Sequence, residues 1–225
     1  MKPDIVMVGG WAHLAKALQP LAEALRDFAE PRLVAAHEPL PAPERPAFLL
    51  GWSLGGLLAL RAARAASQHW LGLILVGTCA RFCAAPDYPQ GVAPARVRAL
   101  KAALRKHPAD ALSRFFADAA APQTVPPEAL AERVRDALAI GTDALAAGLE
   151  SLLTLDLRAK LEPDGQPALV LHGREDQVIP WPAGAWLAEH LRFSRFVLLE
   201  GVGHDLPCRA PGPAVQEIRA FIDTF

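Results

Sequence analysis

The residues from Gly51 to Gly55 read Gly-Trp-Ser-Leu-Gly, a G-x-S-x-G pattern between an apolar run and an alanine-rich stretch. A serine between a strand and a helix sits on a sharp turn that exposes its hydroxyl at the sheet edge. The turn requires very small neighbours, which Gly51 and Gly55 supply. The Leu54 N–H then lies at a helix N-terminus and can donate to an oxyanion. This pattern predicts Ser53 as a nucleophile, against the alternative of an ordinary serine in a glycine-rich turn.

A serine hydroxyl needs a base to become a good nucleophile, and in this motif the acid and the histidine follow the serine in the chain. Asp176 lies in the loop after the apolar run 168–171 and is the favoured acid, while the adjacent Glu175 stays open. His204 follows the last apolar run in a glycine-flanked loop and is the expected base, against the alternative of a surface histidine. We expect His172 to be a structural residue beside the Asp176 loop.

A second oxyanion donor is expected in the loop after the first apolar run, which reads Gly9-Gly10-Trp11-Ala12. Small residues let the backbone approach a bound acyl oxygen, so the Trp11 N–H is the natural donor. The Trp11 ring could also form a wall of the acyl pocket. The alternative is that Trp11 is only a core aromatic residue. His13 lies close to this loop in the sequence.

The elements that position these residues are predicted from short apolar runs that alternate with amphipathic stretches. The runs are apolar throughout, as expected of parallel strands covered on both faces. Expected strands are 5–8, 32–36, 47–50, 71–76, 168–171 and 195–199, and expected helices are 14–28, 54–67, 183–191 and 214–225. The pattern predicts an α/β fold with a mainly parallel sheet of about six strands and helices on both faces.

The alternation of strands and helices is interrupted between residues 82 and 155. Helical stretches broken by prolines predict an inserted helical lid there. Residues 1–81 and 156–225 then form the α/β core. Within the lid, the stretch from Arg96 to Arg114 holds six basic residues against one acidic residue, a balance of +5. From Phe115 to Glu150 there are two basic and six acidic residues, a balance of −4. A solvated helix surface is the plain alternative for this charge pattern.

The composition narrows the class of protein. The chain has 225 residues, of which 52% are hydrophobic, enough for a sizeable core. The formal net charge of −1 gives no global electrostatic case for binding nucleic acid or an anionic membrane. Three cysteines, Cys79, Cys83 and Cys208, exclude a disulfide scaffold and suit a reducing compartment. We expect a soluble cytoplasmic protein with a single domain.

With these residues in place, the chain resembles the serine hydrolases of the α/β-hydrolase family over nearly its whole length. Within that family it is similar, in a compact form, to the pimeloyl-[acyl-carrier protein] methyl ester esterases of biotin synthesis. The motifs that carry this likeness are Gly10-Trp11, residues 50–57, Ser113-Arg114-Phe115, Gly148-Leu149-Glu150, Asp156-Leu157-Arg158, Gly173-x-x-Asp176 and His204.

The resemblance implies ester hydrolysis through an acyl-enzyme, with Ser53 as nucleophile, His204 as base and Asp176 as its orienting acid. Trp11 and Leu54 would form the oxyanion hole, and the reaction would need no metal ion or cofactor. Substrate contacts are implied for Trp11, Arg114, Phe115, Phe116 and Ala119. Contacts with an acidic acyl-carrier protein are implied for Arg96, Arg98, Lys101, Arg105 and Arg114. Small esters are further expected substrates, and we expect a monomer without nucleic-acid or membrane partners.

The chain departs from the family pattern at two places that bear on the site. Gly9 stands where the family usually has histidine, and Ala119 stands where a polar substrate contact is expected. Two other functions remain open: a short-chain carboxylesterase or carbon–carbon-bond hydrolase without a protein partner, and a catalytically silent binding protein. The intact Ser53, Asp176 and His204 argue against the silent protein. The basic half of the lid favours the carrier-protein substrate.

Overall fold

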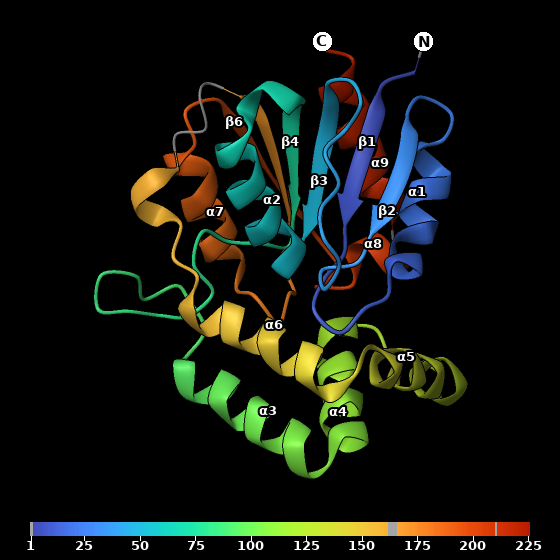
Figure 1. Ribbon diagram of the computed structural model, residues 1–225, viewed down its shortest axis with the longest axis vertical. Helices are drawn as coiled ribbons and strands as arrows, with labels where there is room; N and C mark the ends of the chain where they lie inside the picture. Colours follow the sequence, from blue (N-terminus) through green and yellow to red (C-terminus); the bar gives the residue numbers. More distant parts are fainter. Residues whose placement is uncertain (1, 162–165, 210) are drawn as a thin grey trace.

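The structure is a computed structural model that describes residues 2–161, 166–209 and 211–225. Within these residues, six strands form one parallel sheet in the order β2-β1-β3-β4-β5-β6 (Figure 1). The strands are Asp4–Val8 (β1), Glu30–Val34 (β2), Ala47–Trp52 (β3), Trp70–Val76 (β4), Ala168–Gly173 (β5) and Ser194–Leu199 (β6). The α/β fold class and the parallel sheet predicted from the apolar runs are confirmed.

Alternate residues of each strand face opposite layers of helices. In β1, Ile5 and Met7 share a core with the helices at Gln19–Leu25 (α1) and Pro211–Ile222 (α9). Val6 and Val8 share a core with the helices at Leu54–Ala65 (α2) and Trp181–His190 (α7). Both faces of the central strands are therefore buried, which explains why their sequences are apolar throughout. The helices outside the insertion are α1 (Gln19–Leu25), α2 (Leu54–Ala65), α7 (Trp181–His190), α8 (Leu206–Arg209) and α9 (Pro211–Ile222), with short 3-10 turns at Ala15–Leu18, Ser67–His69 and Arg158–Lys160.

Two expected boundaries differ from the structure for local reasons. The second strand begins at Glu30, two residues before the expected 32–36, because Glu30 pairs with Asp4 in parallel register. The helix expected over 14–28 is a 3-10 turn followed by α1. Pro20 lies in the first turn of α1, where a missing N–H leaves no helical hydrogen bond unmade.

The insertion between β4 and β5 folds as four helices, which we call the cap. They are α3 (Pro94–Lys106), α4 (Pro108–Ala120), α5 (Pro127–Ile140) and α6 (Thr142–Thr154). Three of them begin at a proline, which ends the preceding segment and fits the first helical turn. The cap lies beyond the carboxyl ends of the strands (Figure 1). It shares a hydrophobic core with Trp11, Leu54 and Leu57, so the cap covers the edge where Ser53 lies.

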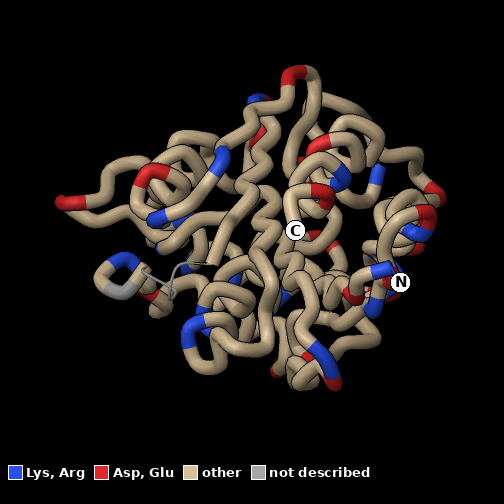
Figure 2. Tube along the Cα trace, turned by 90° about the horizontal axis from the view of Figure 1, so that it is seen from above, with Lys and Arg blue, Asp and Glu red and all other residues tan. Residues whose placement is uncertain are grey.

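The described residues contain no single helix that is long and apolar enough to cross a membrane. Among the described helices, α5 and α6 taken together have the length and composition of a membrane span, but they bend by 92° where they meet. Basic and acidic positions are interspersed over the end of the molecule that carries both termini (Figure 2). The basic residues of α3 lie at the other end, on the cap (Figure 1).

The first turn of α2 packs so closely against the end of β1 that only glycine fits at position 55. A Cβ at Gly55 would lie 2.3 Å from the Val8 carbonyl oxygen and 2.4 Å from that of Gly9. A Cβ at Gly51 would lie 2.5 Å from the Gly55 carbonyl oxygen. Because these contacts are with backbone, no side-chain movement can relieve them. The close packing holds the turn around Ser53 against the sheet.

Replacing Gly55 by alanine should therefore lower the free energy of unfolding by about 1–3 kcal/mol, the range typical of overpacked cores. Urea denaturation, monitored by circular dichroism, measures this change in the free energy of unfolding. Gly212→Ala is the matched control, because a Cβ there meets no atom within 4 Å and lies in α9. The control should be as stable as the parent protein or slightly more stable. Equal stability of the two variants would contradict the close packing.

Candidate active site

Ser53 occupies the turn between β3 and α2 with a backbone conformation of φ 58° and ψ −121°. This positive φ is costly for a residue other than glycine, so the surrounding structure must hold it. The Ser53 N–H donates to the Val76 carbonyl at 3.0 Å, and the Thr78 hydroxyl donates to the Ser53 carbonyl at 2.7 Å. Thr78 also fills the space beside Gly56, where a Cβ would lie 2.4 Å from its Oγ1. Thr78 thus fixes the turn, a role that no sequence motif indicated.

The His204 ring joins the two other predicted residues by short hydrogen bonds. Its Nε2 lies 2.9 Å from Ser53 Oγ, and its Nδ1 lies 2.7 Å from Asp176 Oδ2. All three residues are buried. Because the carboxylate accepts the Nδ1 hydrogen, Nε2 is left to accept the serine hydroxyl hydrogen. The Trp52 indole donates to the His204 carbonyl at 2.9 Å and holds the loop in place.

Asp176 is held as a charged group by contacts on both carboxylate oxygens. Its Oδ1 accepts the N–H groups of Val178 and Ile179, each at 2.8 Å. Burial raises the pKa of Asp176, but the nearby His204 and His172 rings lower it by more than burial raises it. The net pKa of Asp176 therefore lies well below its usual value. His172 is fully buried with its Nε2 3.3 Å from Asp176 Oδ2, beside the Asp176 loop as expected. Glu175 makes no contact with His204 among the interactions of the described residues.

The loop after β1 lies against the turn that carries Ser53. A Cβ at Gly10 would come within 3.3 Å of Ser53 Cβ, and Ala12 adopts a positive φ of 62°. Among the described residues, neither the Trp11 N–H nor the Leu54 N–H donates a hydrogen bond. Both groups are thus available for an oxyanion, and their role as its donors remains a prediction.

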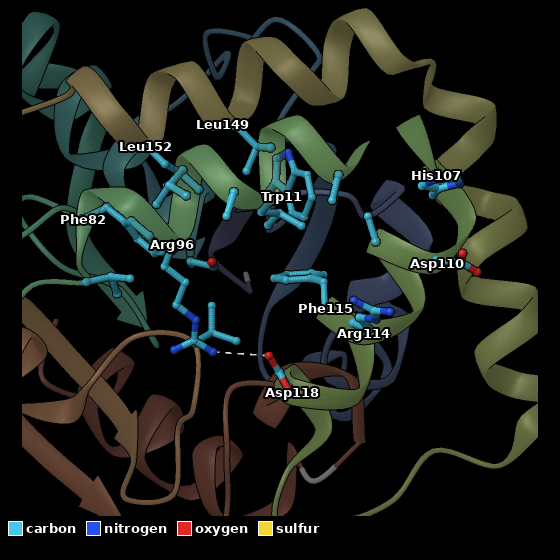
Figure 3. Close-up of a pocket in the computed structure, with 18 residues that line it drawn as sticks. Trp11, Phe82, Arg96, His107, Asp110, Arg114, Phe115, Asp118, Leu149 and Leu152 are labelled. Carbon is cyan, nitrogen blue, oxygen red and sulfur yellow. Dashed lines mark hydrogen bonds and ion pairs between the residues drawn. The ribbon is translucent and has the colours of Figure 1, made fainter. Parts of the chain in front are cut away.

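A cavity of about 340 Å³ opens onto Ser53 between the sheet edge and the cap (Figure 3). Its walls are mainly apolar and come from α3, α4, α6 and the loops after β1 and β4. Its rim carries charge. The apolar lining includes Trp11, Phe82, Val92, Val97, Leu100, Phe115, Leu149, Leu152 and Val178, and the polar rim includes Arg96, His107, Asp110, Arg114 and Asp118. Most of the apolar lining could not be predicted, because it depends on how cap helices face the core.

Trp11 is clamped at the wall of this cavity. Its ring meets Phe115 edge-on with centroids 4.7 Å apart, and its indole N–H donates to the Leu145 carbonyl at 2.8 Å. Gly148 allows α6 to approach the ring, since a Cβ there would lie 2.6 Å from Trp11 Cδ1. The contacts place Trp11 and Phe115 in the lining, where substrate contacts were expected.

Phe116 and Ala119 lie outside the lining of this cavity, and the substrate contacts expected of them remain a prediction. Helix α4 turns Arg114, Phe115 and Asp118 toward the cavity and its neighbouring face toward the core. Phe116 is fully buried against the His13 ring, with centroids 5.2 Å apart. The Ala119 carbonyl accepts the Asp205 N–H at 3.0 Å. Both residues hold the cap on the core.

The five basic residues of the cap that were expected to contact a carrier protein lie on two surfaces. Arg96 and Arg114 lie at the cavity rim, where Arg96 pairs with Asp118 at 3.2 Å (Figure 3). Three others line a separate groove that shares no residue with the cavity: Arg98, Lys101 and Arg105. In that groove Lys101 forms an ion pair with Glu150. On α3 the helical period turns Arg96 toward the cavity and the other three residues toward the groove, although the four are mixed in the sequence.

Comparison with protein-family models matches residues 8–217 to the "Alpha/beta hydrolase family". The chain belongs to the α/β hydrolase family. It is an enzyme that hydrolyses carboxylic esters, in agreement with its sequence relatives. Pimeloyl-[acyl-carrier protein] methyl ester esterases of Aromatoleum aromaticum and Nitrosomonas europaea are 32% and 31% identical, each over 90% of this chain and over 91% and 88% of their own.

A further relative is the biotin biosynthesis bifunctional protein BioHC of Cellvibrio japonicus, 30% identical over the whole of this chain. The chain spans 48% of that longer protein. Among solved structures, the esterase EaEST from Exiguobacterium antarcticum matches with a TM-score of 0.86 at 19% identity, over 98% of this chain and 92% of its own. The enol-lactonase from Burkholderia xenovorans matches with a TM-score of 0.82 at 18% identity, over 99% and 92%. These structural likenesses support the hydrolase fold.

The contacts of Asp176 and Glu175 predict very different effects of removing each charge. Asp176→Asn should lower kcat for a p-nitrophenyl ester by ~10⁴, because the amide no longer fixes the histidine tautomer or stabilises the imidazolium. Glu175→Gln is the matched control and should change kcat by less than about threefold, since its carboxylate does not touch His204. Steady-state kinetics on both variants, with circular dichroism to verify folding, gives the comparison. A larger loss in Glu175→Gln would reverse the assignment of the acid.

Proposed function

We propose that this protein hydrolyses the methyl ester of a pimeloyl group carried on acyl-carrier protein, using Ser53, His204 and Asp176 as its catalytic triad. The observation that carries the proposal is the hydrogen-bonded chain from Asp176 through His204 to Ser53 at an apolar cavity with an arginine rim. The relatives at 31–32% identity are pimeloyl-[acyl-carrier protein] methyl ester esterases, which supports this choice of substrate.

The first half of the reaction forms an acyl-enzyme. Ser53 Oγ attacks the ester carbonyl carbon while His204 Nε2 takes the hydroxyl proton, a transfer for which their separation of 2.9 Å is suited. The Asp176 carboxylate stabilises the resulting imidazolium. The N–H groups of Trp11 and Leu54 stabilise the tetrahedral oxyanion, a contribution of ~3 kcal/mol per donor in well-studied hydrolases.

The second half releases the acid. His204 returns its proton to the leaving methoxide, so methanol departs and the acyl group stays on Ser53. A water molecule then gives a proton to His204 and attacks the acyl carbon. The second tetrahedral intermediate collapses, His204 returns the proton to Ser53 Oγ, and the free carboxylic acid is released on its carrier. Every proton in this cycle is handled by this chain's own residues.

The cavity and its rim have the chemistry that such a substrate requires. The acyl chain is a linear hydrocarbon, which matches the apolar walls formed by Trp11 and Phe115. The carrier arm contains a phosphodiester, and a guanidinium can bind phosphate oxygens through two parallel hydrogen bonds. Arg114 lines the rim and makes no ion pair within the part of the chain described, so its charge is available for this contact.

A hydrolase for small free esters would need the apolar cavity and the triad, but not the arginine rim. The two functions therefore differ in whether substrate binding depends on Arg114. Arg105 provides a comparison, because it is also an exposed arginine of the cap but lies in the separate groove. Its response shows whether the carrier protein also covers that groove.

Arg114→Ala should raise KM for the carrier-bound methyl ester by about tenfold, or ~1.4 kcal/mol, because the phosphate contact is lost. The same variant should hydrolyse p-nitrophenyl butyrate like the parent protein, since the triad is untouched. The effect should shrink at high salt, because exposed charge pairs are screened. Kinetics with both substrates at low and high salt, on Arg114→Ala and Arg105→Ala, provide the test. Equal losses on both substrates would favour the small-ester hydrolase.

A further inference from the structure

A buried cluster of three potential metal ligands lies outside the catalytic cavity. His13 follows the loop of Trp11, Asp205 follows His204, and Cys208 belongs to α8. A ring nitrogen of His13, a carboxylate oxygen of Asp205 and the Cys208 sulfur all lie within 4.8 Å of one another. The proposed ester hydrolysis does not use any of these three side chains.

Two atoms of this cluster are buried without a hydrogen-bond partner among the described residues: His13 Nε2 and Asp205 Oδ1. His13 is 6% exposed and Asp205 is 4% exposed, so solvent does not satisfy them freely. A buried polar atom that is left unpaired destabilises the folded state. Two such atoms in one cluster point to a bound species that is shared between them.

The hydrogen bonds around the cluster show that both orphaned atoms are electron-pair donors. His13 Nδ1 lies 2.8 Å from the Trp11 carbonyl oxygen, which can only accept, so Nδ1 carries the hydrogen and Nε2 presents a lone pair. Asp205 Oδ2 accepts from Arg133 at 2.6 Å, and Oδ1 remains free. The shared species must therefore supply positive charge or hydrogen-bond donors.

The surroundings match those of a metal-binding histidine and carboxylate. Histidine ligands usually donate their second ring N–H to a backbone carbonyl or carboxylate, as His13 does to Trp11. Ligating carboxylates are commonly held by a further hydrogen bond, as Arg133 holds Asp205. A set of imidazole nitrogen, carboxylate oxygen and thiolate sulfur is typical of Zn²⁺.

We propose that His13, Asp205 and Cys208 bind one Zn²⁺ ion. The Cys208 thiol would lose its proton to solvent on binding, because thiolate is the ligand form. Zinc bonds of about 2.0–2.3 Å require the three ligand atoms to draw slightly closer together. A neighbouring cavity of about 240 Å³, lined by His13, Arg133 and Cys208, gives access and room for a water molecule as fourth ligand.

Such an ion would join the loop of Trp11 to the loop of His204 without touching the reacting atoms. Its effect is therefore on stability. Because Zn²⁺ would bind the folded state in preference to the unfolded state, saturating Zn²⁺ should raise Tm by several degrees relative to protein dialysed against chelator. Cys208→Ala should lose this rise.

The test uses the full chain without a histidine tag, dialysed against chelator. Competition with a chromophoric chelator should give one Zn²⁺ per chain, with binding weakened about tenfold or more in Cys208→Ala and in His13→Ala. Cys83→Ala is the matched control, since Cys83 is a buried thiol beside Val92 and outside the cluster. Glu132→Gln controls for the acidic mouth of the neighbouring cavity. Both controls should bind like the parent protein.

Co²⁺ provides a readout on the parent protein that does not depend on the folding of any variant. Bound Co²⁺ should show a thiolate-to-metal charge-transfer band together with the visible bands of tetrahedral coordination. Absence of stoichiometric Zn²⁺ binding, absence of the thiolate band, or unchanged affinity in folded Cys208→Ala would each overturn the proposal. A buried water molecule between His13 and Asp205 would then satisfy the two atoms.

Discussion

The left-handed backbone conformation of Ser53 is the constraint on which the rest of the site depends. It turns the chain from β3 into α2 so sharply that the serine hydroxyl stands at the sheet edge, 2.9 Å from His204 Nε2. The conformation is costly by itself and is held by Val76 at the end of β4 and by Thr78 in the loop that follows. It also requires the close packing of α2 against β1, which Gly55 makes possible. The residues that stabilise this turn are thus the same residues that position the Ser53 hydroxyl for reaction.

The cap does more than cover this edge. Helices α4 and α5 and the connection between them hold the loop of His204 through three contacts: the Ala119 carbonyl with the Asp205 N–H, Arg133 with the Asp205 carboxylate, and Gln123 with the Gly201 carbonyl. Its helices α3, α4 and α6 also supply most of the cavity wall. A displacement of the cap would therefore change both the acyl pocket and the support of the histidine. This coupling links the shape of the cavity to the geometry of the proposed triad.

Much of the fold could be predicted from the sequence because the strands are identified by short runs of neighbouring residues. Strands buried on both faces are apolar runs, so all six were placed within two residues at either end, and β2 was displaced as a whole by two residues. The residues around Ser53, Asp176 and His204 follow such runs, and the carboxyl ends of parallel strands meet at one edge. Features that depend on helix orientation could not be predicted, such as the turning of Phe116 and Ala119 to the core. The contacts of Thr78 and the cluster of His13 with Cys208 join distant parts of the chain and have no motif.

The central claim is that His204 activates Ser53 as the nucleophile that carries the acyl group. The most direct measurement is intact-protein mass spectrometry after reaction with an alkyl fluorophosphonate, which modifies an activated serine as an ester would, followed by peptide mapping. The account predicts a single adduct on the peptide that contains Ser53, none in Ser53→Ala, and much slower labelling in His204→Gln. An adduct on another residue, or undiminished labelling in folded Ser53→Ala, would contradict it.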